Sequence, residues 1–256
     1  MRFITKIFIA TIALVLFLAS PLMAQNLRYS YKAERVLMDK SHDEPAEPVV
    51  RAIIARYKPE MDRKMQEVIG VSEVEMRSSR PESLLSNFAA DALVEFAAKR
   101  SGSMVDFGLT NFGGIRAALP GGNIRLYDVF SIFPFENYVV ILDLPGKSVK
   151  ALFESFARNR VEALSGNVKL VIDEDDREIE ELLINGEKLD MSKIYRIATI
   201  DFLLSGGDNV IALKDAVKVE ETGLLIRDAI IEKIASFSAS GTKVSARIDG
   251  RVKYED

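Results

Sequence analysis

Hydrophobic residues recur at helical spacing in several stretches of the chain. One stretch predicts an amphipathic helix over residues 47–68, closed by Gly70. A second helix is expected to start near Ser79 with a capping box. Its buried face should consist of Leu85, Phe88, Ala89, Ala92, Leu93, Phe96 and Ala97. Two shorter helical patterns follow over residues 147–159 and 223–237.

Strand patterns alternate with these helices. Short apolar or alternating runs predict strands over residues 71–76, 104–110, 138–144, 168–172, 179–184, 194–200 and 244–248. The polar turn over residues 173–178 indicates an antiparallel hairpin. Because strands and helices intermix, we predict an α/β fold in the broad sense (α+β), with a mixed sheet and flanking helices. Residues 47–256 contain no repeat or Gly/Ser-rich linker, which indicates one domain.

Residues 1–24 have the pattern of a secretory signal peptide. Two basic residues precede an apolar run over residues 7–19, and Ala24 is a small residue suited to a cleavage site. An uncleaved membrane anchor is the alternative, but the run is shorter than the roughly 20 residues that span a bilayer. Residues 25–46 form a polar lead-in that holds the single histidine, His42. We expect an exported chain in a bacterial periplasm, without stable membrane insertion after cleavage.

The amino-acid composition and the local motifs exclude several kinds of functional site. The 256 residues include 34 Lys and Arg against 38 Asp and Glu, a net charge of −4, so no basic excess indicates a nucleic-acid partner. The chain has no Cys and one His, which excludes thiolate metal sites and most multi-histidine metal centres unless another chain supplies ligands. Gly146-Lys147-Ser148 lacks the upstream glycine of a P-loop, and the acidic run 173–176 lacks EF-hand spacing. We predict no catalytic residue, metal site or cofactor in this chain.

The segment TNFGGIR, residues 110–116, places polar side chains after a strand. Asn111 can both donate and accept, which suits the edge of a heterocycle. Arg116 offers a planar fork for phosphate or carboxylate. A tight turn with an Arg ion pair is the alternative, and these residues alone leave both interpretations open.

Two further segments add aromatic surfaces and a carboxylate. In FPFENY, Phe135 follows a stiffening proline and is placed to stack on a ring, with Asn137 beside it. In DFLLSGGDN, Phe202 follows a strand, and Asp208 sits in a glycine turn where it can accept from two neighbouring hydroxyls, as a ribose offers. Core aromatics and an ordinary turn carboxylate are the alternatives. Together the three segments indicate a nucleoside or sugar-nucleotide pocket without a nucleophile.

These three segments, in this order, resemble the C-terminal domain of the 5'-nucleotidase family over about residues 73–254. SNFAADAL, LPGKSVKALFE and SGNVKLVID extend the resemblance. In that family two phenylalanines hold the base of the substrate, asparagines contact the base, and an aspartate binds the ribose. The resemblance implies a substrate site formed by Asn111, Gly114, Arg116, Phe135, Asn137, Phe202 and Asp208. Two family arginines fall near Arg77 and Arg80, where the local spacing differs slightly.

The resemblance also implies a missing part. Family enzymes place their chemistry in an N-terminal metallophosphoesterase domain that holds two divalent metals, and the residues before 73 do not match that domain. We therefore expect a hydrolase-family chain without a complete catalytic site. Its expected role is to bind the base and ribose of a nucleotide for hydrolysis by a separate metallophosphoesterase chain, which would carry the metals, in nucleotide catabolism.

Two rival functions stay open at this stage. One is a non-catalytic periplasmic module that binds nucleotides or nucleosides, and the other is a structural protein that kept the fold and lost the ligand. The helix over residues 47–68 is expected to be a linker remnant, a docking surface for the missing domain, or part of the core.

Overall fold

The computed structural model describes residues 29–39 and 47–255, which fall into two compact units divided after Arg51. The predicted signal peptide, its cleavage site and His42 lie outside the described residues. Residues 29–39 are exposed and form no helix or strand. Within the described residues, no helix is both long and apolar enough to cross a membrane.

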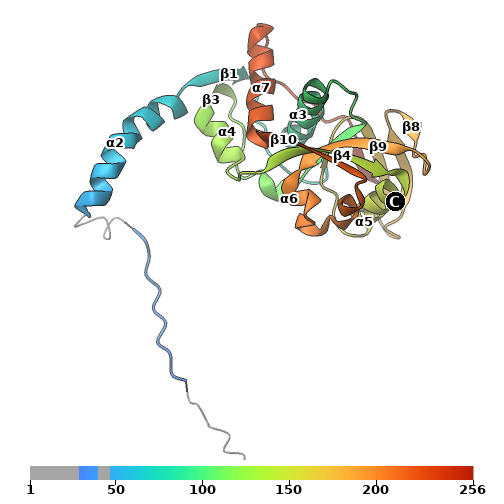
Figure 1. Ribbon diagram of the computed structural model, residues 1–256, viewed down its shortest axis with the longest axis horizontal. Helices are drawn as coiled ribbons and strands as arrows, with labels where there is room; N and C mark the ends of the chain where they lie inside the picture. The colour runs from blue at the N-terminus through green and yellow to red at the C-terminus, as the bar shows by residue number, and fades with distance from the viewer. Residues whose placement is uncertain (1–28, 40–46, 256) are drawn as a thin grey trace, which may run out of the picture. The chain divides into compact units, whose positions relative to one another are not determined.

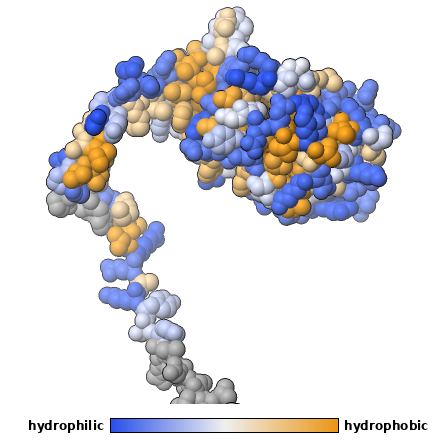
Figure 2. All heavy atoms as spheres, viewed as in Figure 1, coloured by the Kyte–Doolittle hydropathy of each residue, from blue (hydrophilic) through white to orange (hydrophobic). Residues whose placement is uncertain are grey.

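The first predicted helix is present as α2, Pro48–Met65 (Figure 1). None of its side chains is buried, and Figure 2 shows apolar residues on its visible face. The helix ends earlier than predicted, because Val68 and Gly70 belong to the strand β1, Val68–Ser72. This strand pairs antiparallel with β3, Gly122–Arg125, which the sequence pattern did not indicate.

A five-stranded mixed sheet forms the centre of the fold. Its order is β10-β4-β9-β2-β5. The bounds are β2 Phe107–Thr110, β4 Tyr138–Pro145, β5 Ala163–Leu164, β9 Ile194–Ile200 and β10 Lys218–Leu225. β9 pairs in parallel with β2 and antiparallel with β4, so the mixed sheet predicted from the sequence is confirmed.

Helices cover both faces of this sheet. The ring of Phe107 on β2 packs on Phe153 of α5, Gly146–Arg158, with centroids 5.6 Å apart. A Cβ on the next residue, Gly108, would lie 2.9 Å from the carbonyl oxygen of Ala90 in α3, Leu84–Ser101. Because successive residues of a strand point to opposite faces, the sheet lies between α3 and α5.

The second predicted helix corresponds to α3, and its expected apolar face is buried. The predicted start near Ser79 is wrong. Ser83 is the N-cap: its Oγ accepts from the backbone N–H of Ser86, and its own backbone N–H donates to the Oγ of Ser86. Ser83 itself has an extended backbone, and Arg80, before the helix, contacts Val161 and Glu162 far along the chain.

A smaller four-stranded sheet has the order β11-β6-β7-β8. Its strands are β6 Val168–Asp173, β7 Ile179–Ile184, β8 Glu187–Lys188 and β11 Val252–Glu255. β6 and β7 pair antiparallel, which confirms the predicted hairpin. The predicted strand over residues 244–248 is wrong, because β11 takes the edge of β6 and only Val244 forms a bridge, to Ser72.

The remaining helices are short or lie beside α3. They are α4 Leu126–Ile132, α6 Asp201–Leu204, α7 Ile226–Ala239 and the 3-10 turns η2 Phe112–Gly114, η3 Gly207–Asn209 and η4 Ile211–Asp215. α7 contacts α3, α4 and β1. It begins later than the predicted residue 223, because residues 223–225 complete β10.

Arg251 supplies the first prediction, which concerns stability. Its side chain is 3% exposed, and it donates to carboxylate oxygens of Asp91 (2.9 Å) and Asp249 (2.8 Å) and to the carbonyl of Leu164 (2.9 Å). Arg251→Met should lower the free energy of unfolding by about 3 kcal/mol, because these acceptors lose a buried partner. Urea unfolding followed by circular dichroism measures the change. Arg247→Met, at a side chain 86% exposed, is the control and should cost less than about 0.5 kcal/mol; equal losses would contradict the assignment.

Candidate functional site

Three strand ends meet at one edge of the central sheet. β2 and β9 run parallel, so Thr110 and Ile200 end at the same edge. β4 runs antiparallel to β9 with Val139 opposite Ile200, so β4 begins where β9 ends. The segments that follow β2 and β9 and the segment that precedes β4 therefore emerge together. These are the three segments that the sequence singled out.

The carboxylate of Asp201 joins two of these segments. Its Oδ1 accepts hydrogen bonds from the backbone N–H groups of Tyr138 (3.0 Å) and Phe202 (2.8 Å). Phe135, just before β4, and Phe202, at the start of α6, are 48% and 41% exposed. Asp201 therefore ties together the backbone segments that carry two exposed aromatic rings.

Asn137, the second asparagine predicted to contact the ligand, directly precedes Tyr138 in the chain. Asn137 is half-buried, and its backbone carbonyl accepts a hydrogen bond from the N–H of Ile226 at 2.9 Å. This bond fixes the segment before β4 to the start of α7. The loop that carries Phe135 is thus anchored at both α6 and α7.

Gly207 makes room for the ring of Phe202. A Cβ on Gly207 would lie 2.4, 2.5 and 2.6 Å from three atoms of that ring, so one face of the ring lies on the glycine. Asp208 and Asn209 follow with φ angles of 51° and 63°, in the left-handed region that Asp and Asn tolerate best. Asp208 thus follows directly in the chain on the glycine that lies against the ring of Phe202.

Asp208 and Asn111 are in direct contact. The Nδ2 of Asn111 donates to the Oδ2 of Asp208 at 2.6 Å. Asn111 is 5% exposed, and its Oδ1 has no hydrogen-bond partner among the described residues. Gly114 lies against this oxygen, since a Cβ there would be 2.6 Å away from it. The predicted Asn, Gly and Asp positions therefore form one cluster.

Glu162 is a buried carboxylate that was not predicted from the sequence, and it contacts the turn that follows β2. Glu162 is 4% exposed and accepts from the Nη2 of Arg80 at 2.8 Å and from the backbone N–H of Phe112 at 2.7 Å. Arg80 also donates to the carbonyl of Val161 and lies over the ring of Phe112, with its guanidinium carbon 4.4 Å from the ring centroid. Burial raises the pKa of Glu162, although the bonds from Phe112 and Arg80 oppose that rise. The available sequence signal was an acidic residue within an apolar run, VEAL.

A cavity of about 530 Å³ adjoins this cluster. The groups on its wall include Arg80, Gly113, Arg160, Glu162, Asp208 and Asn209. Two guanidinium groups and two carboxylates thus face a volume that would hold a small polar ligand.

The other two predicted arginines do not line the cavity. Arg116 is exposed, and its Nη1 donates to the carbonyl of Gly113 at 3.4 Å. Arg77 is 78% exposed and pairs with Glu75 at 2.5 Å. The structure therefore brings Arg80 into the cluster, keeps Arg116 at its rim through Gly113, and leaves Arg77 apart.

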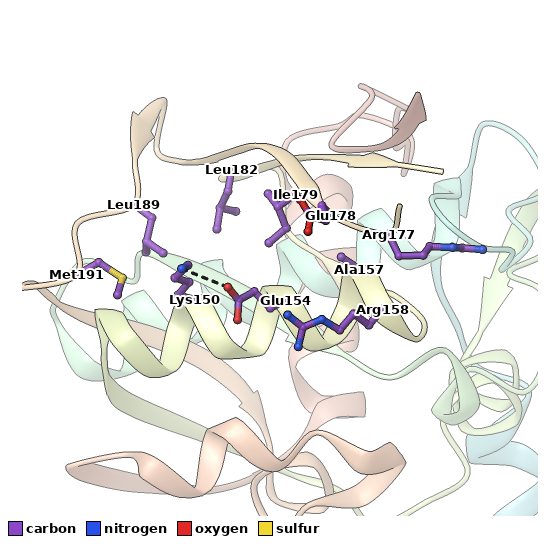
Figure 3. Close-up of a pocket in the computed structure, with 10 residues that line it drawn as sticks. All are labelled: Lys150, Glu154, Ala157, Arg158, Arg177, Glu178, Ile179, Leu182, Leu189 and Met191. Atoms are coloured by element: carbon purple, nitrogen blue, oxygen red, sulfur yellow. Dashed lines mark ion pairs between the residues drawn. The ribbon is translucent and has the colours of Figure 1, made fainter. Parts of the chain in front are cut away.

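A separate groove of about 490 Å³ lies between α5 and the hairpin of β7 and β8 (Figure 3). Its apolar side chains include Ile179, Leu182 and Leu189, and Lys150 pairs with Glu154 at 3.2 Å across the same helix face. None of the residues predicted from the sequence to bind substrate lines this groove.

The described part of the chain offers no metal centre. In residues 29–39 and 47–255, no three His, Asp or Glu side chains are grouped so that they could hold a metal ion. These residues do not fit the two-metal centre that the family resemblance implies.

Comparisons with known proteins match most of the described chain. The family profile described as "5'-nucleotidase, C-terminal domain" matches residues 68–215, more than half of the sequence. The trifunctional nucleotide phosphoesterase protein YfkN of Bacillus subtilis is 29% identical over 225 residues, which cover 80% of this chain and 15% of that protein. Protein UshA of Escherichia coli is 30% identical over 151 residues, which cover 56% of this chain and 27% of UshA.

Solved structures show the same fold. The 5'-nucleotidase precursor from Thermus thermophilus has a TM-score of 0.68 at 24% identity, over 81% of this chain and 43% of that one. NAD nucleotidase from Haemophilus influenzae has a TM-score of 0.61 at 19% identity, over 82% of this chain and 41% of that one. At these identities the likeness concerns the fold, and it confirms the predicted fold class. The chain spans less than half the length of each of these relatives.

The raised pKa of Glu162 predicts how the free energy of unfolding changes with pH. The pKa of Glu162 is higher in the folded than in the unfolded chain. The protonated side chain therefore adds to the free energy of unfolding. This contribution is fully present below the unfolded pKa and is lost as the pH rises through the folded pKa. Relative to Glu162→Gln, the wild type should therefore lose stability as the pH rises from about 4.5 towards 8. Urea unfolding of both proteins across this range measures the difference. Glu178→Gln, at an exposed site, should show no such trend; a difference that does not vary with pH would contradict the raised pKa.

Proposed function

The chain belongs to the 5'-nucleotidase C-terminal domain family, and we propose that it is the nucleotide-binding part of a phosphoesterase system. It is exported to a bacterial periplasm and binds the base and ribose of a nucleotide. It presents the phosphate to a separate metallophosphoesterase chain, which carries the divalent metals. Its role lies in nucleotide catabolism, where it supplies specificity rather than bond cleavage.

The meeting of the three loop segments at one sheet edge carries this proposal. Phe135 and Phe202 expose aromatic surface there, and Asn111 and Asp208, on the segments that follow β2 and β9, place an amide and a carboxylate in contact with each other. A nucleoside offers a planar base for stacking and two neighbouring hydroxyls for a carboxylate. The side chains at the edge therefore match the two chemically distinct parts of a nucleoside.

The relatives support the same substrate class. YfkN is described as a nucleotide phosphoesterase and the Thermus structure as a 5'-nucleotidase precursor. The word precursor and the predicted signal peptide over residues 1–24 support export. Because these relatives are more than twice as long as the matched region, their catalytic activity is not assigned to this chain.

The second candidate function is a nucleotide- or nucleoside-binding module that serves no phosphoesterase. It is favoured by the described residues themselves, which offer stacking and hydrogen-bonding groups but do not fit a metal centre. The two candidates agree about the site and differ about the fate of the ligand. A hydrolytic chain that accepts nucleotide from this protein would decide between them.

The direct test is binding measured beside hydrolysis. Isothermal titration calorimetry of the chain lacking residues 1–24 with AMP, UMP and adenosine should show binding of all three ligands or of a subset. A phosphate-release assay with manganese on the same sample should show no release. Release would contradict a chain that only binds, and no heat with any of the three ligands would contradict the nucleotide site.

Replacing the aromatic rings tests the stacking. Phe135→Ala and Phe202→Ala should each cost about 1–3 kcal/mol of adenosine binding energy if both rings stack on the base. Gly207→Ala keeps the Phe202 ring but pushes it off the backbone, so it should weaken binding as well. Calorimetry measures all three. Tyr127→Ala removes an exposed ring on α4 and is the control; full affinity in both Phe variants would rule out stacking.

Replacing Arg116 tests whether the phosphate of a bound nucleotide lies near this side chain. Arg116→Ala should weaken the binding of AMP by about 1–2 kcal/mol more than the binding of adenosine, because only AMP has a phosphate that the guanidinium can contact. The comparison of the two dissociation constants checks it. Arg77→Ala, at the exposed arginine paired with Glu75, is the control. An equal loss for AMP and adenosine would assign Arg116 to the ribose or to the turn.

A further inference from the structure

Glu162 is a buried acid for which the binding proposal has no use. It is 4% exposed, yet it lies on the wall of the 530 Å³ cavity. One carboxylate oxygen holds the guanidinium of Arg80, and the other accepts the backbone N–H of Phe112, the residue after Asn111. The carboxylate therefore contacts both the cationic group of the cavity and the turn that carries the predicted base contact.

We propose that Glu162 is a specificity-determining residue, whose charge neutralises Arg80 and thereby sets how strongly the site prefers a phosphate-bearing ligand over a nucleoside. This inference rests on the proposed function, because it requires the phosphate of a bound nucleotide to lie in the field of Arg80. It assigns to the family site a residue that no motif indicated.

The charges on the cavity wall support this role. Arg80 and Arg160 are cationic, whereas Glu162 and Asp208 are anionic, so these groups sum to zero. Neutralising Glu162 leaves one net positive charge on the wall. A phosphate gains from that charge, whereas an uncharged nucleoside gains almost nothing.

Arg80 is held in place by more than Glu162. It also donates to the carbonyl of Val161 and lies over the ring of Phe112. Loss of the carboxylate charge therefore removes the neutralisation without removing the other contacts that orient the guanidinium. This separation of charge from position is what makes the role testable.

The same role makes ligand preference depend on pH. Arg80 faces Glu162 from the segment before α3, Asp208 faces it from η3, Phe112 donates to it from η2, and Arg160 precedes it in its own segment. Burial raises the pKa of Glu162, and the charge of Asp208 adds to that rise. Glu162 thus takes up its proton at a higher pH than an ordinary glutamate does. As the pH falls through this pKa, the charge of Arg80 becomes uncompensated.

The experiment compares AMP and adenosine in wild type and Glu162→Gln by calorimetry, in steps from about pH 8 down to about pH 4.5, the ordinary pKa of a glutamate. At the higher pH the variant should favour AMP over adenosine about three- to tenfold more than the wild type does. On acidification the wild type should approach the variant. The titration of the AMP phosphate is common to both proteins, so the difference between their pH profiles belongs to Glu162.

Two variants complete the design. Arg80→Met combined with Glu162→Gln should show no gain for AMP, because the cation that Glu162 neutralises is gone. Glu178→Gln, an exposed carboxylate on the other groove, should leave both the preference and its pH profile unchanged. Melting temperatures check that each variant folds, and the pH profile of wild type against Arg80→Met repeats the test if Glu162→Gln does not fold.

The possible failures are distinct. An AMP preference in Glu162→Gln equal to that of wild type would overturn the inference, as would an equal loss of AMP and adenosine, which indicates a structural role. If adenosine and AMP both fail to bind the wild type, the proposed function fails and this inference fails with it. A pH profile of the preference that is the same in wild type and Glu162→Gln would assign the effect to another group and also overturn the inference.

Discussion

The pairing of one strand with two neighbours that run in opposite directions determines where the site can form. β9 lies parallel to β2 and antiparallel to β4, and its pairing with β4 is continuous from Val139 opposite Ile200 to Pro145 opposite Ile194. A shift of one residue in this register would turn every side chain of β9 to the other face of the sheet, where different helices pack. The ends of the three strands, and hence the three loops, are fixed by the same hydrogen bonds that hold the core.

Polar groups then hold the loops that the strands deliver. Asp201 ties the segment before β4 to α6, and Glu162 ties the segment before α3 to the turn after β2. Buried carboxylates are costly unless all their oxygens find donors. Both oxygens of Glu162 do so, and these bonds restrict the loops more than apolar contacts could, because they specify direction as well as distance.

The sequence was informative where the signal is local. The bounds of β7 and β9 were predicted correctly, because each is a mainly apolar segment that begins and ends at Ile between polar turns, and the buried face of α3 followed from its periodicity. β10 was missed because it is an edge strand with a largely polar sequence, and β11 because its partner β6 lies far away along the chain. Pairing between strands that are far apart along the chain produces no pattern in the local sequence.

The same distinction applies to the candidate site. Residues at strand ends, such as Asn111 and Phe202, stand out because an apolar run stops beside them. Arg77 and Arg80 could not be separated from each other by spacing. Only contacts with Glu162 and Val161, distant in the sequence, place Arg80 in the cluster, whereas Arg77 pairs with nearby Glu75.

The glycine beneath Phe202 gives the site a direction. One face of the ring lies against the backbone of Gly207, so a flat ligand could stack only on the part of the ring that stays exposed. Asp208 follows immediately in the chain, so in the proposed nucleotide site its carboxylate would lie to one side of a ligand stacked on this ring. Turning the same ligand over would carry its hydroxyl groups away from that carboxylate. A nucleotide bound as proposed would therefore present one particular face of its base to Phe202, a stereochemical choice made by the absence of a single side chain at Gly207.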